Sequence, residues 1–240
     1  MRIAYLDCAQ GASGDMLLAS LVDAGLPLDE VASVIRALGL DDELTVAAEE
    51  TTSGGFRALR LRVDVRPGKH RTVEAMLAAV DGADLPDAVR ARSRVTIERL
   101  ADVESGLHGI PRGALHLHEL SGADTLVDVV GFHAGCERLG IVELSASAVN
   151  VGSGMVTFSH GTFAVPAPAT GELLRGVPLH GDPEPVGELT TPTAAAILVT
   201  TVARFGPMPP LRLERVGYAV GARVSARPRV LRCFVGEATG

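Results

Sequence analysis

Residues 56–65, FRALRLRVDV, decide the fold class because apolar and charged side chains alternate along their second half. The leucines and valines at odd positions 59–65 share one face of an extended strand, and the charged residues at 60, 62 and 64 share the other. This alternation is typical of a half-buried antiparallel strand. We expect residues 43–50 to pair with it across a turn at Ser53-Gly54-Gly55. The apolar stretch 2–8 indicates a buried, central strand.

Helical and extended patterns alternate along the rest of the chain. The predicted helices are 15–24, 28–38, 72–80, 86–106, a short helix ending at 174, and 192–204 after a Thr191 cap. The predicted strands are 143–151, 211–220 and 229–236, with a loop at 152–154 and an irregular segment over 159–161 and 166–170 before the short helix. We therefore predict a mixed α/β (α+β) fold, a mixed sheet with flanking helices. Residues 1–240 are expected to form one domain, with a possible subdivision near 140–150.

Composition excludes several classes of protein. The 240 residues carry a net charge of −7 with scattered basic residues and 3% aromatics, so no nucleic-acid-binding surface is expected. No apolar run approaches the ~20 residues of a membrane helix. The N-terminus reaches Asp7 without a signal-peptide apolar region. Three widely spaced cysteines fit a reducing compartment, and we expect the chain to be cytoplasmic.

The segment 115–119, LHLHE, followed by SGADTLVD at 121–128, is the richest in metal-ligand side chains. If 115–118 are extended, His116 and His118 share a face at roughly 6–7 Å. A following helix puts Asp124 and Asp128 on one stripe. Imidazole with carboxylate favours nickel, cobalt or zinc over calcium or magnesium. The alternative is a capping box in which Ser121 and Asp124 only begin a helix.

Three other segments contain candidate site residues. Asp7 lies at a strand end, and the loop 11–14 opens a helix at Asp15 whose free amides could hold a phosphate. The run 68–71, GKHR, could receive a phosphate or be solvated surface. His160 lies between small residues in a loop, where a ligand could reach it, although it could equally be a surface histidine.

Several short motifs occur together in one order. They are Tyr5-Leu6-Asp7-Cys8 with GASGDM at 11–16, His70-Arg71-Thr72, His116-Leu117-His118-Glu119 with Asp124 and Asp128, Asn150-Val151-Gly152, Ser159-His160-Gly161 with PAPAT at 166–170, Thr191-Pro192-Thr193, and Gly217-Tyr218. In this combination the chain resembles the LarC-type nickel insertion proteins over about residues 3–236. The segment after Glu119 departs slightly from the family pattern but keeps both aspartates in register.

The resemblance implies insertion of Ni²⁺ into pyridinium-3,5-bisthiocarboxylic acid mononucleotide. A nickel–carbon bond forms at the pyridinium ring and completes the nickel-pincer cofactor of lactate racemase. In this family the step depends on CTP hydrolysis, and full-length members continue into a region associated with CTP binding. The chain resembles only the N-terminal half. The implied partners are the dithio-pyridinium mononucleotide, a nucleotide-binding C-terminal counterpart supplying CTP with Mg²⁺ or Mn²⁺, and a lactate racemase-like apoenzyme.

Roles for individual residues follow from the resemblance and from the chemistry. We expect nickel ligands among His116, His118, Glu119, Asp124, Asp128, Asp7 and Asp15. Since nickel–carbon bond formation needs a base for the ring proton, we expect His160 or His70 in that role. Arg71 with the amides of Gly11, Ser13 and Gly14 would hold the phosphate. We expect Asp7, His116, His118, Asp124, Asp128 and His160 to converge on one cleft.

Two alternative functions remain open at this point. The first is a non-catalytic nickel-binding or cofactor-scaffold subunit whose partner performs the nucleotide-driven step. The second is a metal-dependent phosphoesterase, which the content of histidine and aspartate alone permits.

Overall fold

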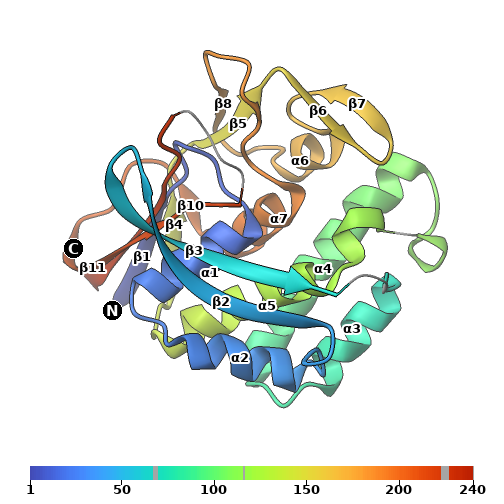
Figure 1. Cartoon of the computed structure of the whole chain (residues 1–240), viewed down its shortest axis with the longest axis horizontal. Coiled ribbons are helices and arrows are strands. Elements are labelled where there is room, and N and C mark those ends of the chain that lie inside the picture. The colour runs from blue at the N-terminus through green and yellow to red at the C-terminus, as the bar shows by residue number, and fades with distance from the viewer. Residues whose placement is uncertain (67–69, 116, 223–226, 240) are drawn as a thin grey trace.

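The structure is a computed structural model that describes residues 1–66, 70–115, 117–222 and 227–239 (Figure 1). The side chains of His118 and Glu119 also lie outside the described part. Helices and strands are intermixed along the chain, and the main sheet contains both parallel and antiparallel pairs. The predicted mixed α/β fold is therefore confirmed.

The main sheet has the strand order β10-β4-β1-β12-β11-β3-β2 in the described residues. Its strands are β1 (Arg2–Asp7), β2 (Leu44–Ser53), β3 (Phe56–Val65), β4 (Glu143–Ala146), β10 (Arg204–Phe205), β11 (Leu211–Ala219) and β12 (Leu231–Ala238). The apolar strand β1 is central, antiparallel to β12 and parallel to β4. The predictions for residues 2–8, 211–220 and 229–236 are confirmed.

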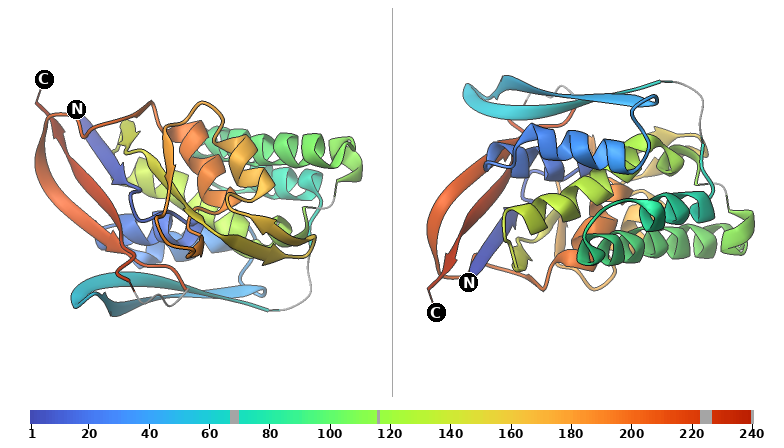
Figure 2. Two further views of the ribbon diagram at one scale, coloured as in Figure 1. Left: turned by 90° about the horizontal axis from the view of Figure 1, so that it is seen from above. Right: turned by 90° about the horizontal axis from the view of Figure 1, so that it is seen from below.

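The β2–β3 hairpin also forms as predicted, with pairs running from Leu44↔Val65 to Ser53↔Phe56. Gly54 and Gly55 make the turn with φ values of 58° and 82°, which other residues rarely adopt. The hairpin forms an outer layer over α1 and α2 (Figure 2). Strand β3 joins the rest of the sheet through a single parallel pair, Ala219↔Leu59. The apolar face of β3 is buried at Leu59 and Leu61, but Val65 at the strand end is exposed.

The helices pack against one another, and residues such as Leu17, Phe132 and Ile197 lie in the buried core. The helices are α1 (Gly14–Asp23), α2 (Leu28–Ala37), α3 (Val73–Gly82), α4 (Asp87–His108), α5 (Ala123–Arg138), α6 (Pro168–Leu173) and α7 (Pro192–Thr201). Each lies close to a predicted helix. The smaller sheets lie at the top of Figure 1, with α2 and α3 at the bottom. Thr191 caps α7 by accepting a hydrogen bond from the Ala194 amide at 3.4 Å, as predicted.

Two predictions in the second half are wrong. The strand predicted at 143–151 is divided into β4 and β5 (Val149–Ser153), which belong to different sheets. The chain turns at Ser147, whose Oγ accepts a hydrogen bond from the Cys8 amide at 2.9 Å. The segment around His160 is a hairpin, β6 (Met155–Phe158) and β7 (Gly161–Ala164), and not irregular. Strands β8 (Leu179–Gly181) and β9 (Gly187–Glu188) flank β5.

The chain between α4 and α5 differs from the extended conformation considered for 115–118. After a short 3₁₀ turn at Arg112–Ala114 (η1), Leu115 is extended, but Leu117 has φ −73° and ψ 7°. A second 3₁₀ helix, His118–Ser121 (η2), follows, because the Leu120 amide donates to the Leu117 carbonyl at 2.8 Å. His116 lies outside the described residues. Gly122 caps α5 without a side-chain hydrogen bond, so the Ser121–Asp124 capping box does not form.

In the part of the chain that the structure describes, every helix is too short or too polar to span a membrane.

Candidate metal and nucleotide site

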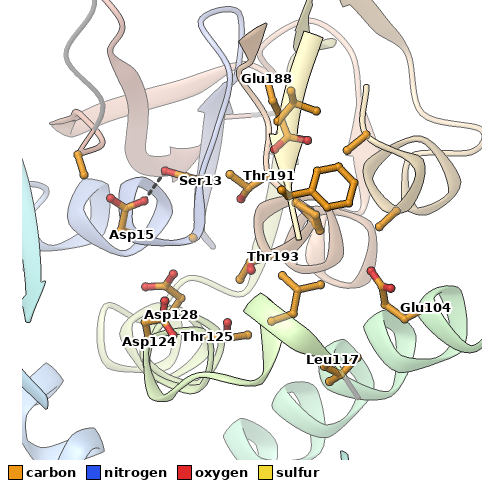
Figure 3. Close-up of a pocket in the computed structure, with 18 of the residues that line it drawn as sticks. Ser13, Asp15, Glu104, Leu117, Asp124, Thr125, Asp128, Glu188, Thr191 and Thr193 are labelled. Carbon is orange, nitrogen blue, oxygen red and sulfur yellow. Dashed lines mark hydrogen bonds between the residues drawn. The ribbon is translucent and has the colours of Figure 1, made fainter. Parts of the chain in front are cut away.

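A cavity of about 930 Å³ opens where several element ends meet. The starts of α1, α5 and α7, the end of α4, strand β3 and the β6–β7 hairpin line it. Cavities of this size hold small-molecule ligands. Figure 3 shows Asp15 of α1 near Asp124 and Asp128 of α5, with Glu104 of α4 on the other side of the view.

The carboxylates of Asp15, Asp124 and Asp128 form one wall of this cavity. Helices α1 and α5 approach closely because residue 14 is glycine: a Cβ there would lie 2.3 Å from Asp128 Oδ2. Asp124 and Asp128 are four residues apart on α5 and therefore share a face. Ser13 donates a hydrogen bond from its hydroxyl to Asp15 (Figure 3).

The electrostatics of this wall are unfavourable for negative charge. Burial raises the pKa of Asp128 well above its usual range, and the charges of Asp15 and Asp124 raise it further. Among the described residues, Asp128 Oδ1 is buried without a hydrogen-bond partner. Burial also raises the pKa of Asp15, although the Ser13 hydrogen bond and the charge of Arg60 oppose that shift. A cation placed here would relieve the repulsion.

Histidine and aromatic rings form a second wall. The ring centroids of His108 and His160 lie 4.9 Å apart with an interplanar angle of 51°. Glu104 lies 3.4 Å from His108 Nε2, one helical turn away on α4. Phe158 and Phe163 stack at 5.1 Å on the hairpin. This wall offers imidazole nitrogens beside a flat apolar surface, which suits an aromatic ligand with a proton to lose.

Six of the predicted site residues border the cavity. They are Ser13, Gly14, Asp15, Asp124, Asp128 and His160. His116 and His118 were also expected in this cavity. His116 lies outside the described residues, as do the side chains of His118 and Glu119. The neighbouring Leu117 and Leu120 line the cavity, which brings the segment to its edge.

The other predicted residues are absent from the cavity lining in the described structure. Asp7 accepts hydrogen bonds from Arg232 Nε at 3.0 Å and from the Ala9 amide at 3.1 Å. His70 Nδ1 lies 2.9 Å from Ser121 Oγ. Arg71 forms a half-buried ion pair with Glu43.

The predicted phosphate-binding loop is partly occupied by its own backbone. The Gly11 amide donates to the Cys8 carbonyl and the Ala12 amide to the Leu189 carbonyl, each at 3.0 Å. The carboxylate of Asp15 itself accepts hydrogen bonds from backbone amides at the start of α1. The loop therefore has fewer free donors than its glycine-rich sequence indicates.

Sequence reasoning missed several charged or titratable cavity residues, among them Glu104, His108 and Arg60. The spacing of Glu104 and His108 at i and i+4 on a predicted helix was a usable signal. Gly109, with φ 65°, caps α4 directly after His108. Within the described residues, no group of three or more His, Cys, Asp or Glu side chains is placed to hold a metal ion. A complete ligand set would therefore need the 116–119 segment or a ligand from the substrate.

Comparison with known proteins gives a consistent match. Residues 4–240 match the nickel insertion protein family. The chain is 41% identical over 238 residues to the pyridinium-3,5-bisthiocarboxylic acid mononucleotide nickel insertion protein of Desulfitobacterium hafniense, covering 99% of this chain and 59% of that protein. It is 36% identical over 230 residues to the protein of the same name from Staphylococcus epidermidis, covering 95% and 58%. The chain thus spans about three fifths of the relatives it matches. No solved structure matches it significantly.

Proposed function

The chain belongs to the nickel insertion protein family, and from that premise we propose that it inserts Ni²⁺ into pyridinium-3,5-bisthiocarboxylic acid mononucleotide. The product would be the nickel-pincer cofactor of lactate racemase. The observation that carries the proposal is the wall of three carboxylates, Asp15, Asp124 and Asp128, in a cavity large enough for a mononucleotide.

In this proposal nickel is a substrate, held briefly and then released in the product. Asp124 and Asp128, with Asp15 beside them, would supply oxygen ligands, and the adjoining His116, His118 and Glu119 would complete the set. Mixed imidazole and carboxylate ligands suit Ni²⁺. Because the two thiocarboxylates of the substrate also bind nickel, the protein needs only a few exchangeable ligands. A weak site favours transfer over retention.

Formation of the nickel–carbon bond releases one proton from the ring carbon. Ni²⁺ takes the place of that proton, and a base must accept it. His160 is the candidate because its ring borders the cavity, whereas His70 contacts Ser121. Imidazole is a common general base in proteins.

We assign the CTP-dependent step to a nucleotide-binding counterpart with Mg²⁺ or Mn²⁺. The 240 residues contain no Walker-type phosphate loop with its lysine. The chain alone would bind nickel and the precursor, and the completed cofactor would need the counterpart and CTP.

Nickel titration of the purified chain, with and without the dithio-pyridinium mononucleotide, tests the proposal. Replacing His116 and His118 together by alanine should weaken nickel binding by more than the roughly 10- to 100-fold of an indirect effect. His180→Ala is the matched control, because His180 is exposed on β8 outside the cavity lining. An unchanged isotherm in the double variant would remove both histidines from the ligand set. Failure of the wild-type chain to bind nickel in either condition would contradict the proposed function.

A further inference from the structure

A second cavity of about 360 Å³ adjoins the first. The two share lining residues, which are Ser13, Asp15, Arg60, Glu188, Thr191 and Ala222. The outer part of the second cavity is bordered by the β2–β3 turn at Ser53 and Gly54, and by Arg227 and Arg229 before β12. A ligand with two chemically different ends could therefore occupy both spaces.

Arg60 of β3 stands at the junction of the two cavities. Its Nε is buried without a hydrogen-bond partner, and its guanidinium makes no ion pair within the described residues. Other arginines of β3 differ in this respect. Arg57 pairs with Asp23 at 2.7 Å and Glu50 at 3.0 Å, and Arg62 pairs with Asp64 at 2.9 Å. A half-buried arginine that lines a cavity and has no ion-pair partner is suited to an anionic ligand.

Of the other two arginines that line the second cavity, Arg229 adds positive charge to its outer part. Arg229 donates from its backbone amide to Ser53 Oγ at 3.1 Å and from Nη2 to the Val186 carbonyl at 3.5 Å, so hydrogen bonds at both ends hold it at the rim. Arg227 pairs with Glu184 and with Asp182, the latter at 3.5 Å, so its charge is largely neutralised. Among the described lining residues, the carboxylates are those of Asp15 and Glu188, both on the shared wall.

We propose that the second cavity holds the phosphate of the pyridinium mononucleotide, with Arg60 as its principal ligand. The inference rests on the proposed function. With Ni²⁺ held between its two thiocarboxylates, the pyridinium end of the substrate has a net positive charge before the ring proton leaves and would lie against the carboxylates of the first cavity, whereas those carboxylates would repel a phosphate dianion. Arg60 lies where the ligand must cross from one space to the other. The arrangement fixes the direction of the substrate: ring toward Asp124 and His160, phosphate toward the β2–β3 turn.

Arg71 and the 11–14 loop are less suited to this task. Arg71 is paired with Glu43, and the Gly11 and Ala12 amides are bonded to carbonyl groups. Binding a phosphate at Arg71 would require breaking a half-buried ion pair, whereas Arg60 has no ion pair to break within the described residues.

The test compares binding of pyridinium-3,5-bisthiocarboxylic acid mononucleotide with binding of its riboside, which lacks the phosphate. The variant is Arg60→Gln, and the matched control is Arg57→Gln, an arginine of the same strand that lines neither cavity. Titration calorimetry should show that Arg60→Gln weakens the mononucleotide by roughly 10- to 100-fold, the effect of losing charge-assisted hydrogen bonds. Binding of the riboside should change little. Arg60→Lys should recover part of the loss because it restores the charge.

Nickel titration of the same variants separates this inference from the proposed function. Arg60→Gln should still bind nickel, and any loss should be smaller than its loss for the mononucleotide, because Arg60 acts on Asp15 only through its charge. The phosphate site alone would be overturned if Arg60→Gln retained nickel binding but lost affinity equally for the mononucleotide and the riboside, or lost affinity for neither. Wild-type protein that binds the two compounds equally, or neither of them, would also overturn it. If the wild-type chain binds no nickel but still binds the mononucleotide more tightly than the riboside, the proposed function is contradicted and the phosphate site is supported.

Discussion

The carboxyl group of Asp128 lies in the contact between α1 and α5, where one of its oxygens is buried without a partner. A buried, unpaired carboxylate is costly because water no longer solvates its charge. Its pKa, raised first by burial and then by Asp15 and Asp124, reflects this cost. Such a residue weakens the fold when no cation is present, which is a common feature of binding sites.

Asp128→Asn should therefore stabilise the metal-free protein at neutral pH by about 0.5–2 kcal/mol. The folded-state pKa lies above the unfolded one, so the carboxyl contributes stability at low pH and loses it as pH rises through the folded value. The gain from the substitution should thus disappear near pH 4, where the carboxyl is largely neutral in both states. Thermal unfolding with a chelator present measures this. Asp124→Asn, on the exposed part of the same helix face, should change stability little.

At the scale of elements, three helices meet around a buried histidine outside the cavity. His133 of α5 has its Nε2 2.9 Å from Thr96 Oγ1 of α4, which in turn lies 2.8 Å from Thr200 Oγ1 of α7. Burial lowers the pKa of His133 to about 4, and the nearby charge of Arg92 acts in the same direction. The imidazole is therefore neutral in the folded protein at physiological pH.

The packing of these helices should become pH-dependent through His133. The unfolded chain binds a proton at this residue near pH 6.5 and the folded chain only near 4, so stability falls as pH decreases across that window. Across this pH range the free energy of unfolding falls by roughly 3 kcal/mol because of this one residue, and below it His133 causes no further loss. Denaturant unfolding at pH 7 and pH 4 should show a smaller difference for His133→Gln than for the wild type. His180→Gln, an exposed control, should keep the wild-type difference; equal pH dependence in both variants would contradict the assignment.

Elements with a strong local pattern could be predicted from the sequence. The β2–β3 hairpin follows from strict alternation around two glycines, and α7 from Thr191-Pro192 at its start. The β6–β7 hairpin could not, because its four-residue strands contain almost no buried side chain and are defined by pairing to each other. The division of 143–151 depends on the Ser147–Cys8 hydrogen bond, a contact between residues 139 positions apart.

At the scale of the molecule, part of the cavity followed from local rules. Helical spacing placed Asp124 and Asp128 on one face, and the loop–helix motif placed Ser13 and Asp15 at a helix start. The meeting of His108 with His160 did not follow, since it requires the end of α4 to reach the β6–β7 hairpin. The ion pair of Arg71 with Glu43 could not be predicted either, because a run of basic residues does not indicate which acidic residue lies near it in the fold.

The single pair that joins β3 to β11 has a consequence for the exchange of backbone hydrogens with solvent. The Leu59 carbonyl accepts from Val220 on the β11 side, so the N–H groups of Leu61 and Val63 face the same way. Those of Arg60 and Arg62 face β2, where the ladder protects them. Among the described residues Leu61 and Val63 have no backbone partner on that side, and both line the first cavity.

Deuterium uptake along β3 should therefore alternate, fast at Leu61 and Val63 and slow at Arg60 and Arg62, as NMR of the free chain would resolve residue by residue. A bound mononucleotide should slow only the odd-numbered amides, because it shields the open edge without touching the ladder. Uniform protection along β3 in the free chain would mean that this edge is closed, and uniform loss would mean that the hairpin opens as a whole. Deuterium uptake at the odd-numbered amides of β3 would therefore report whether a ligand occupies the first cavity.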